Sequence, residues 1–138
     1  MNIMKDSDNK INIRKEQLKK VVENYFESFK TKSFAAIPYS QDVILRAPIA
    51  PGGVHNPLKG KQELLVQWWQ PLEPALDGVV IKVFDHFYND SLTGIITKAE
   101  FTLTGPGITL RVADLFIVNE EGEITEQENH FDASPLRG

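Results

Sequence analysis

The sequence contains no cysteine, which excludes disulfides, thiolate catalysis and cysteine-ligated metal sites. It also lacks any apolar run near the ~18 residues of a membrane-spanning helix, and its first residues lack the apolar segment of a secretion signal. We therefore expect a cytoplasmic protein with no membrane partner. Basic residues do not predominate, because 15 Lys and Arg stand against 19 Asp and Glu. A nucleic-acid partner is not expected, since nucleic-acid binders are usually basic.

Metal-binding and phosphate-binding patterns are missing as well. The histidines His55, His86 and His130 do not have the spacing of zinc ligands. The loop APGGVHNPLKG lacks the Lys-Ser/Thr ending of a phosphate-binding loop. We therefore expect no metal and no other cofactor.

The length of 138 residues fits one domain with its own core. We expect a flexible N-terminus over 1–11, a domain over 12–132 and a tail over 133–138. A first helix should begin after Asn12 as its N-cap. It presents apolar residues at helical spacing, namely Leu18, Val21, Val22, Tyr25, Phe26 and Phe29. A short helical turn is expected over 33–37, and a longer helix over 61–69 with an irregular continuation to Leu76.

The second half of the chain has the pattern of strands. A short strand is predicted over 42–47, and four longer ones over 79–88, 94–103, 108–118 and 123–131. The connections between the last four are too short for parallel crossovers, so these strands should form an antiparallel meander. Helices followed by strands indicate the α+β class. We expect a cone-shaped, curved antiparallel sheet whose concave face is covered by the N-terminal helices, with a pocket inside.

Asp114 is the residue that most needs an explanation. Leu110, Val112, Asp114, Phe116 and Val118 share one face of the strand over 108–118, because side chains alternate with a period of two. A carboxyl on an apolar face either finds donors or stays protonated, and a protonated carboxyl can stabilise an oxyanion. The alternative is a pair with a nearby cation, or a solvent-facing position at a twisted edge.

Tyr25 is the second candidate, since it lies in the middle of the apolar stripe of the first helix. Its hydroxyl beside a protonated Asp114 would form a pair of donors. The alternative is a core aromatic residue that hydrogen-bonds a backbone carbonyl. We therefore regard Tyr25 and Asp114 as catalytic candidates.

Other residues are candidates for ligand contact. A four-residue loop over 119–122 would place Gln127 opposite Asp114 and would turn Gln127 and Asn129 toward the pocket, whereas a slip of one residue would turn Glu126, Glu128 and His130 inward. Phe116 shares the face of Asp114. Trp68 and Trp69 are adjacent on a helix, so at most one can point into a pocket, and Trp68 is our candidate. His86 is a candidate base, although a solvent-facing strand position is the commoner case.

The chain resembles the nuclear transport factor 2-like superfamily, and within it the SnoaL-like polyketide cyclases and ketosteroid isomerases. The stretches that carry the resemblance are VVENYFESFK, VILRAPIAPGG with LKGKQELLVQWW, and VADLFIVNEEGEITEQENHF. The resemblance places Tyr25 and Asp114 where the isomerases carry the tyrosine and aspartic acid of their oxyanion hole. It places Ala47, followed by Pro48, where they carry the catalytic base, and alanine cannot move a proton.

Three functions follow from this resemblance. The first is an enzyme that acts on a small, largely apolar carbonyl or aromatic compound by isomerisation, cyclisation or another lyase-type proton transfer, with a base such as His86 or His55. The second is a non-catalytic protein that binds such a ligand. The third is a protein-interaction module of the same fold.

The strand over 108–118 also suggests an interface. Its other face carries Arg111 and the apolar residues Ala113, Leu115 and Ile117, with Ile124 expected beside Ile117. Exposed apolar patches usually mark interfaces, so we expect a twofold homodimer that pairs sheet against sheet. The alternative is that the tail over 133–138 covers the patch.

Overall fold

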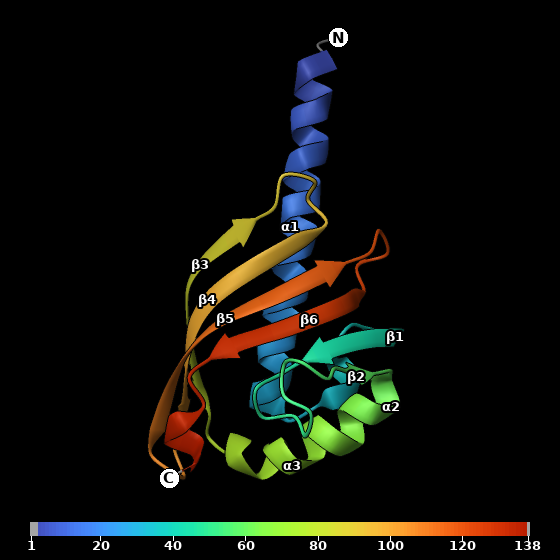
Figure 1. The fold of residues 1–138 in the computed structure, drawn as a ribbon. Helices are drawn as coiled ribbons and strands as arrows, with labels where there is room; N and C mark the ends of the chain where they lie inside the picture. Colours follow the sequence, from blue (N-terminus) through green and yellow to red (C-terminus); the bar gives the residue numbers. More distant parts are fainter. Residues whose placement is uncertain (1–2, 138) are drawn as a thin grey trace.

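The computed structural model describes residues 3–137. Helix α1 (Ile3–Thr31) lies along one face of a curved six-stranded sheet (Figure 1). The strand order is β2-β1-β6-β5-β4-β3. The strands are β1 (Tyr39–Arg46), β2 (Leu58–Lys59), β3 (Val80–Tyr88), β4 (Gly94–Leu103), β5 (Ile108–Val118) and β6 (Ile124–Phe131). This arrangement confirms the α+β class and the curved sheet covered by N-terminal helical structure.

Helix α1 supplies much of the core. All six residues of its predicted apolar stripe are buried against the sheet. The predicted N-cap at Asn12 is wrong, because the helix already begins at Ile3. No glycine or proline interrupts the preceding residues, and extending an existing helix costs little. Residues 3–11 are therefore helical, and the flexibility expected for this segment stays a prediction.

Arg14 fixes the helix against the loops at one end of the sheet. Its guanidinium donates hydrogen bonds to the backbone carbonyls of Leu92 (2.8 Å), Val118 (2.7 Å) and Asn119 (3.1 Å). These carbonyls belong to the β3–β4 loop, the end of β5 and the β5–β6 loop. One side chain thus joins α1 to the β3–β4 and β5–β6 hairpins.

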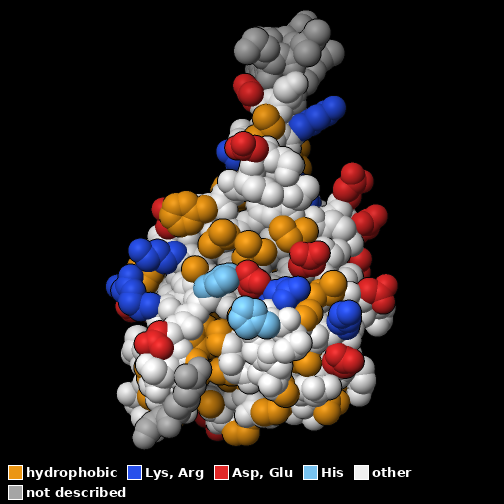
Figure 2. Space-filling model, in the orientation of Figure 1, with side chains coloured by type: hydrophobic (Ala, Val, Ile, Leu, Met, Phe, Trp, Pro, Cys, Tyr) orange, Lys and Arg blue, Asp and Glu red, His pale blue; other side chains and the backbone are white. Residues whose placement is uncertain are grey.

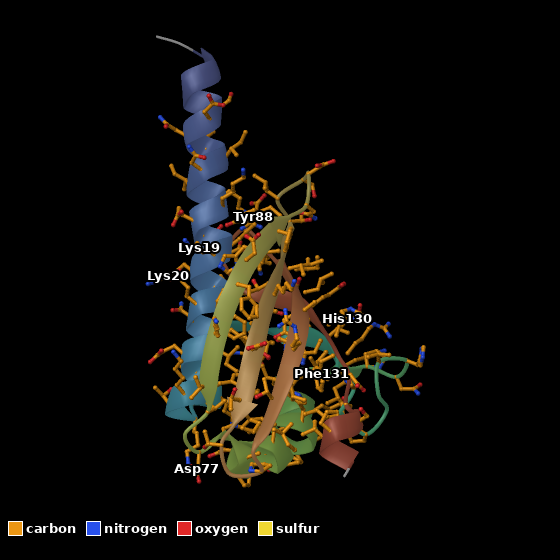
Figure 3. All side chains as sticks on the ribbon, turned by 90° about the vertical axis from the view of Figure 1, so that its left-hand side faces the viewer. Lys19, Lys20, Asp77, Tyr88, His130 and Phe131 are labelled. Atoms are coloured by element: carbon orange, nitrogen blue, oxygen red, sulfur yellow. The ribbon has the colours of Figure 1, made fainter. Side chains whose placement is uncertain are left out.

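The four strands from β3 to β6 form the predicted antiparallel meander. Strand β1 joins this meander beside β6 and runs parallel to it, so the sheet is mixed rather than antiparallel throughout. The chain between β1 and β6 contains most of the domain, and a connection of that length does not restrict the two strands to an antiparallel pair. Figure 3 shows α1 on one side of the sheet and His130 of β6 on the other side.

Helical turns over 61–76 close one end of the cone (Figure 1). They comprise α2 (Lys61–Leu64), a π-helical turn (Leu65–Trp69), α3 (Gln70–Leu72) and a 3₁₀ turn (Glu73–Leu76). Pro71 and Pro74 lie in this region, and each removes a backbone donor that a regular α-helix uses. A 3₁₀ turn over Phe34–Ala36 occupies the region expected for a short helix, and another over Ser134–Arg137 lies in the expected tail. No helix among the described residues has both the length and the apolar character needed to cross a membrane.

The pairing of β5 with β6 differs from the predicted one by two residues. Asp114 pairs with Asn129, and Phe116 pairs with Gln127. The cause is an irregularity near the hairpin, where Val118 pairs with Ile124. Ile124 is therefore fully buried, and its expected place beside Ile117 on the outer face is wrong. Gln127 and Asn129 still face inward, because a shift of two residues preserves the alternation.

Candidate functional site

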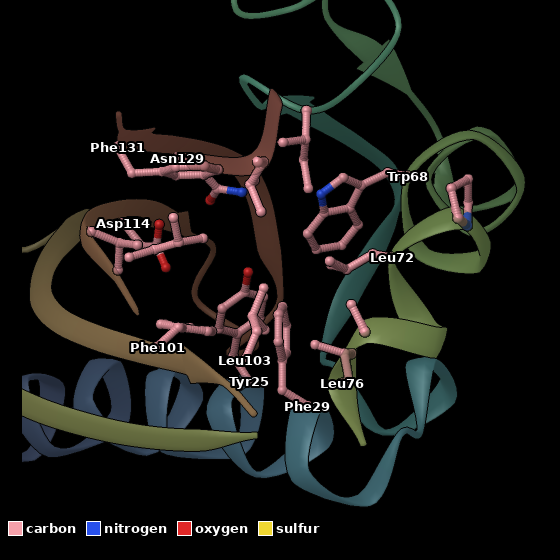
Figure 4. A pocket seen from close by; sticks show the side chains of 16 residues that line it. Tyr25, Phe29, Trp68, Leu72, Leu76, Phe101, Leu103, Asp114, Asn129 and Phe131 are labelled. Carbon is pink, nitrogen blue, oxygen red and sulfur yellow. The ribbon is translucent and has the colours of Figure 1, made fainter. Parts of the chain in front are cut away.

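A cavity of about 220 Å³ lies inside the cone, between α1, the helical turns over 61–76 and the concave face of β4 to β6. Figure 4 shows the side chains that line it. Most are apolar, and they come from every one of these elements: Phe29, Ile49, Pro71, Leu72, Ala75, Leu76, Phe101, Leu103, Leu110, Val112, Phe131 and Leu136. The polar groups are confined to Tyr25, Trp68, Asp114 and Asn129. The cavity can thus enclose a small, largely apolar compound and contact it at a few polar positions.

Asp114 lines this cavity from the middle of β5 and is only 3% exposed. Its carboxyl forms no hydrogen bond and no ion pair with any of the described residues. Burial raises the pKa of Asp114 to about 8, because an apolar environment disfavours the charged form. The carboxyl is therefore largely protonated at neutral pH and offers a donor to the cavity. The alternative expectation is an ion pair between Asp114 and a nearby cation, and no such pair forms among the described residues.

A buried network behind the cavity holds Tyr25. The Tyr39 hydroxyl donates to Gln127 Oε1 at 2.7 Å, which orients the Gln127 amide. Gln127 Nε2 then donates to the Tyr25 hydroxyl oxygen at 3.0 Å and to Asn129 Oδ1 at 3.1 Å. Burial, with a smaller effect from Asp114, raises the pKa of Tyr25 well above its ordinary value. Tyr25 thus keeps its proton.

The network leaves only donors facing the cavity. Tyr25 accepts from Gln127, so its own proton is free to bond a ligand. Asn129 uses its carbonyl oxygen for Gln127, which leaves its amide nitrogen toward the cavity. Figure 4 shows the Tyr25 hydroxyl, the Asp114 carboxyl and the Asn129 amide directed into the same space. Such a set of groups favours an acceptor such as a carbonyl, enolate or phenolate oxygen.

Some predicted site residues do not line the cavity. Phe116 is buried behind it and packs edge-on against the Tyr25 ring at 4.8 Å, and Gln127 acts only through the network. His86 lines a separate hollow between α1 and β3, and its Nδ1 lies 2.8 Å from the Thr97 hydroxyl. Burial, with a smaller effect from Lys19, lowers the pKa of His86. The geometry therefore offers no support for His86 as a base in this cavity.

The position expected for a catalytic base also lacks a titratable group. Ala47 directly follows β1 and is fully buried, and it does not line the cavity. His55 does not line it either. Among the described residues, the titratable groups that line the cavity are those of Tyr25 and Asp114. No group of three or more metal-binding side chains is found in the described part of the chain.

The adjacent tryptophans have different environments. Trp68 lines the cavity, whereas Trp69 packs against Phe29 and donates from its indole nitrogen to Glu73 at 3.1 Å. Sequence reasoning identified Trp68 and, by strand alternation, Phe131, but it missed Ile49 and Leu136 as lining residues. Ile49 and Leu136 lie outside the periodic segments, so no sequence pattern indicated their direction.

Comparison with known proteins gives matches in structure alone. No protein-family model matches the chain, and no curated protein sequence does. A nuclear transport factor 2-like protein of unknown function from Cytophaga hutchinsonii matches with a TM-score of 0.65 at 16% identity, covering 88% of this chain and 95% of that one. A SnoaL-like protein of unknown function from Burkholderia thailandensis matches with a TM-score of 0.69 at 11% identity, covering 85% and 95%. A steroid delta-isomerase from Pseudomonas aeruginosa matches with a TM-score of 0.63 at 14% identity, covering 88% and 84%. The chain therefore has the nuclear transport factor 2-like fold.

Proposed function

We propose that this protein binds a small, largely apolar compound through a carbonyl, enolate or phenolate oxygen. The observation that carries the proposal is the Asp114 carboxyl, which faces an apolar cavity with no protein partner. Tyr25 supplies a second donor beside it. The two would hold one ligand oxygen between them, and the apolar walls would surround the rest of the compound.

Binding of this kind stabilises negative charge on the ligand oxygen. In a water-poor cavity a hydrogen bond to an oxyanion is stronger than in bulk solvent, and the donors need no rearrangement. The steroid delta-isomerase among the structural matches supports a pocket for a compound of this class, by analogy of fold only.

Proton transfer on the bound compound is the second candidate function. It is favoured by the pKa of Asp114 near 8, since a group that titrates close to neutral pH can both hold and release a proton. Isomerisation, cyclisation or another lyase-type step would then depend on Asp114 alone or on a base in the ligand itself, because Ala47 supplies none. The carboxyl thus links binding and catalysis in one residue.

Phenolate binding tests the proposal. Calorimetric titration with 4-nitrophenol should show binding to the wild-type protein that weakens by about tenfold or more in Tyr25→Phe, because a hydrogen bond to a charged group contributes roughly 1.5–3 kcal/mol. Asp114→Asn should also weaken it, since an amide is a poorer donor than a carboxylic acid. Tyr88→Phe and Asp42→Asn are the matched controls, because neither residue lines the cavity. Unchanged affinity in both site variants would contradict the proposal.

We also propose that the outer face of the sheet pairs with a second copy of this chain. Phe87, Ile96 and Leu115 lie in register across β3, β4 and β5, and Phe87 is 54% and Ile96 38% exposed. Figure 2 shows hydrophobic side chains gathered over the ends of these strands, with charged groups of both signs nearby. A patch of this composition can meet its own copy across a twofold axis.

Sedimentation equilibrium at micromolar concentration tests the dimer. The expected result is twice the chain mass of 15.6 kDa, and Leu115→Lys should convert the dimer to a monomer. A wild-type protein that sediments as a monomer would refute the pairing. A third function as a protein-interaction module would then need a different partner for this face.

A further inference from the structure

The indole nitrogen of Trp68 is buried and has no hydrogen-bond partner. Among the side-chain nitrogens and oxygens of the described residues whose own surface is fully covered, it is the one without a hydrogen-bond partner. Trp68 is 2% exposed and forms a wall of the cavity. Leaving a buried donor unpaired destabilises a protein, so native structures contain few of them. A partner from outside the protein would explain why this donor is kept.

A second donor points to the same place. Figure 4 shows the indole nitrogen on the edge of Trp68 that is turned toward Asn129, whose amide nitrogen points toward it. The indole nitrogen itself is covered by protein atoms. The Asn129 amide is held in this orientation, because its oxygen accepts from Gln127 at 3.1 Å. Both groups are donors, so they cannot bond to each other, and one acceptor placed between them would satisfy both.

We infer that Trp68 Nε1 and Asn129 Nδ2 form a second acceptor site in the cavity, next to the site of Tyr25 and Asp114, once the atoms that cover the indole nitrogen move aside. This inference rests on the proposed function and specifies its ligand, which then carries two acceptor oxygens on one apolar frame. A diketone, a quinone or an acylphenol has this chemistry.

The ring of Phe29 lies beside both the tyrosine of the first site and the tryptophan of the second. It lies 4.8 Å from the Tyr25 ring and 6.1 Å from the Trp68 ring, measured between ring centroids. Phe29 also lines the cavity. A flat apolar frame can stack on this ring while its two oxygens reach the two sets of donors. The ligand is therefore an aromatic or otherwise planar compound with two acceptor oxygens.

Two pairs of probes separate the second site from the first. Each pair keeps a phenol for Tyr25 and Asp114 and differs only in an acetyl or an isopropyl group of similar shape. The pairs are 4-hydroxyacetophenone with 4-isopropylphenol, and the longer 6-acetyl-2-naphthol with 6-isopropyl-2-naphthol. In at least one pair, Trp68→Phe should lower the affinity for the acetyl probe by roughly three- to tenfold more than the affinity for the isopropyl probe. A loss of this size is expected for one hydrogen bond.

Trp69→Phe is the matched control. Trp69 is as deeply buried as its neighbour, but its indole nitrogen already donates to Glu73. This variant should change the affinity for the two members of a pair by the same factor. If Trp68→Phe also weakens both members equally in each pair, Trp68 contributes packing only, and the second site is refuted while the first stands.

Nuclear magnetic resonance on the wild-type protein gives a readout that does not depend on the fold of a Trp68 variant. The chain has two tryptophans, and Trp69→Phe assigns their indole N–H signals. The Trp68 signal should move downfield with an acetyl probe and not with its isopropyl partner, while the Trp69 signal serves as the reference. Equal shifts with both members of each pair would overturn the inference. If no probe binds the wild-type protein at all, the proposed function fails and the second site falls with it.

Discussion

The buried carboxyl of Asp114 should make the stability of this protein depend on pH in a direction opposite to that of a salt-bridged aspartate. Its pKa rises from an ordinary value near 3.8 to about 8 on folding, because burial disfavours the charge. Between these two values the folded protein holds one proton more than the unfolded chain, so stability falls as the pH rises. Each pH unit lowers the folding equilibrium constant by about tenfold, and from about pH 5 to about pH 8 the loss is roughly 4 kcal/mol.

The variant Asp114→Asn isolates this effect, since its amide has the shape of the neutral acid and no titration. Urea unfolding of both proteins at a series of pH values gives the difference in unfolding free energy, in which the titration of all other groups cancels. The unfolding free energy of the variant should rise steadily relative to that of the wild type as the pH rises toward 8. Above that pH the difference should stay constant. The variant Asp42→Asn, at an exposed site on β1, gives the background for removal of one carboxyl. If the unfolding free energies of Asp114→Asn and the wild type change in parallel with pH, the Asp114 carboxyl is not neutral in the folded protein.

Three further experiments, on two variants and on the wild type, test other parts of the structure. Arg14→Ala should lower the unfolding free energy by roughly 2–3 kcal/mol without changing phenol affinity, because it removes three hydrogen bonds to loop carbonyls far from the cavity. An unchanged urea midpoint would contradict this anchoring role. Gln127→Leu should cost stability and also weaken phenol binding, since it leaves Tyr25 and Asn129 without their buried partner; calorimetry that shows full affinity would contradict the positioning role. No efficient turnover of a β,γ-unsaturated ketosteroid is expected from the wild type, because Ala47 supplies no base, and a rapid absorbance change in that assay would contradict the account.

The sequence was sufficient for the elements that have a strong periodic pattern. The apolar stripe of α1 and the ranges of β4 and β5 could be predicted, because side-chain direction repeats every 3.6 residues in a helix and every two in a strand. The same alternation identified Asp114, since a carboxyl among apolar neighbours stands out without any knowledge of the fold.

Features that depend on distant contacts could not be predicted in this way. The parallel pairing of β1 with β6 joins strands far apart in the sequence, and no local pattern determines its direction. The irregularity near the β5–β6 hairpin moved the partner of Asp114 from Gln127 to Asn129. The helix start at Ile3 was missed, because Asn12 has the residue type of a cap but does not occupy that position.

The unpaired indole of Trp68 was also beyond sequence reasoning. A tryptophan beside a second tryptophan on a helix indicates a core position, and both residues are in fact buried. Only the arrangement of Glu73, which partners Trp69, and of the cavity, which faces Trp68, distinguishes the two. Which buried donors have a hydrogen-bond partner can be seen only in the folded structure.

The protonation state of Asp114 tests the central claim most directly. A ¹³C NMR titration of its carboxyl carbon, assigned with Asp114→Asn, reports the charge of this one group in the folded protein. The account predicts a midpoint near 8, with the protonated form present at neutral pH and available as a donor to a ligand oxygen. A carboxyl that is fully ionised at neutral pH, with a midpoint at or below the ordinary value for aspartate, would contradict it.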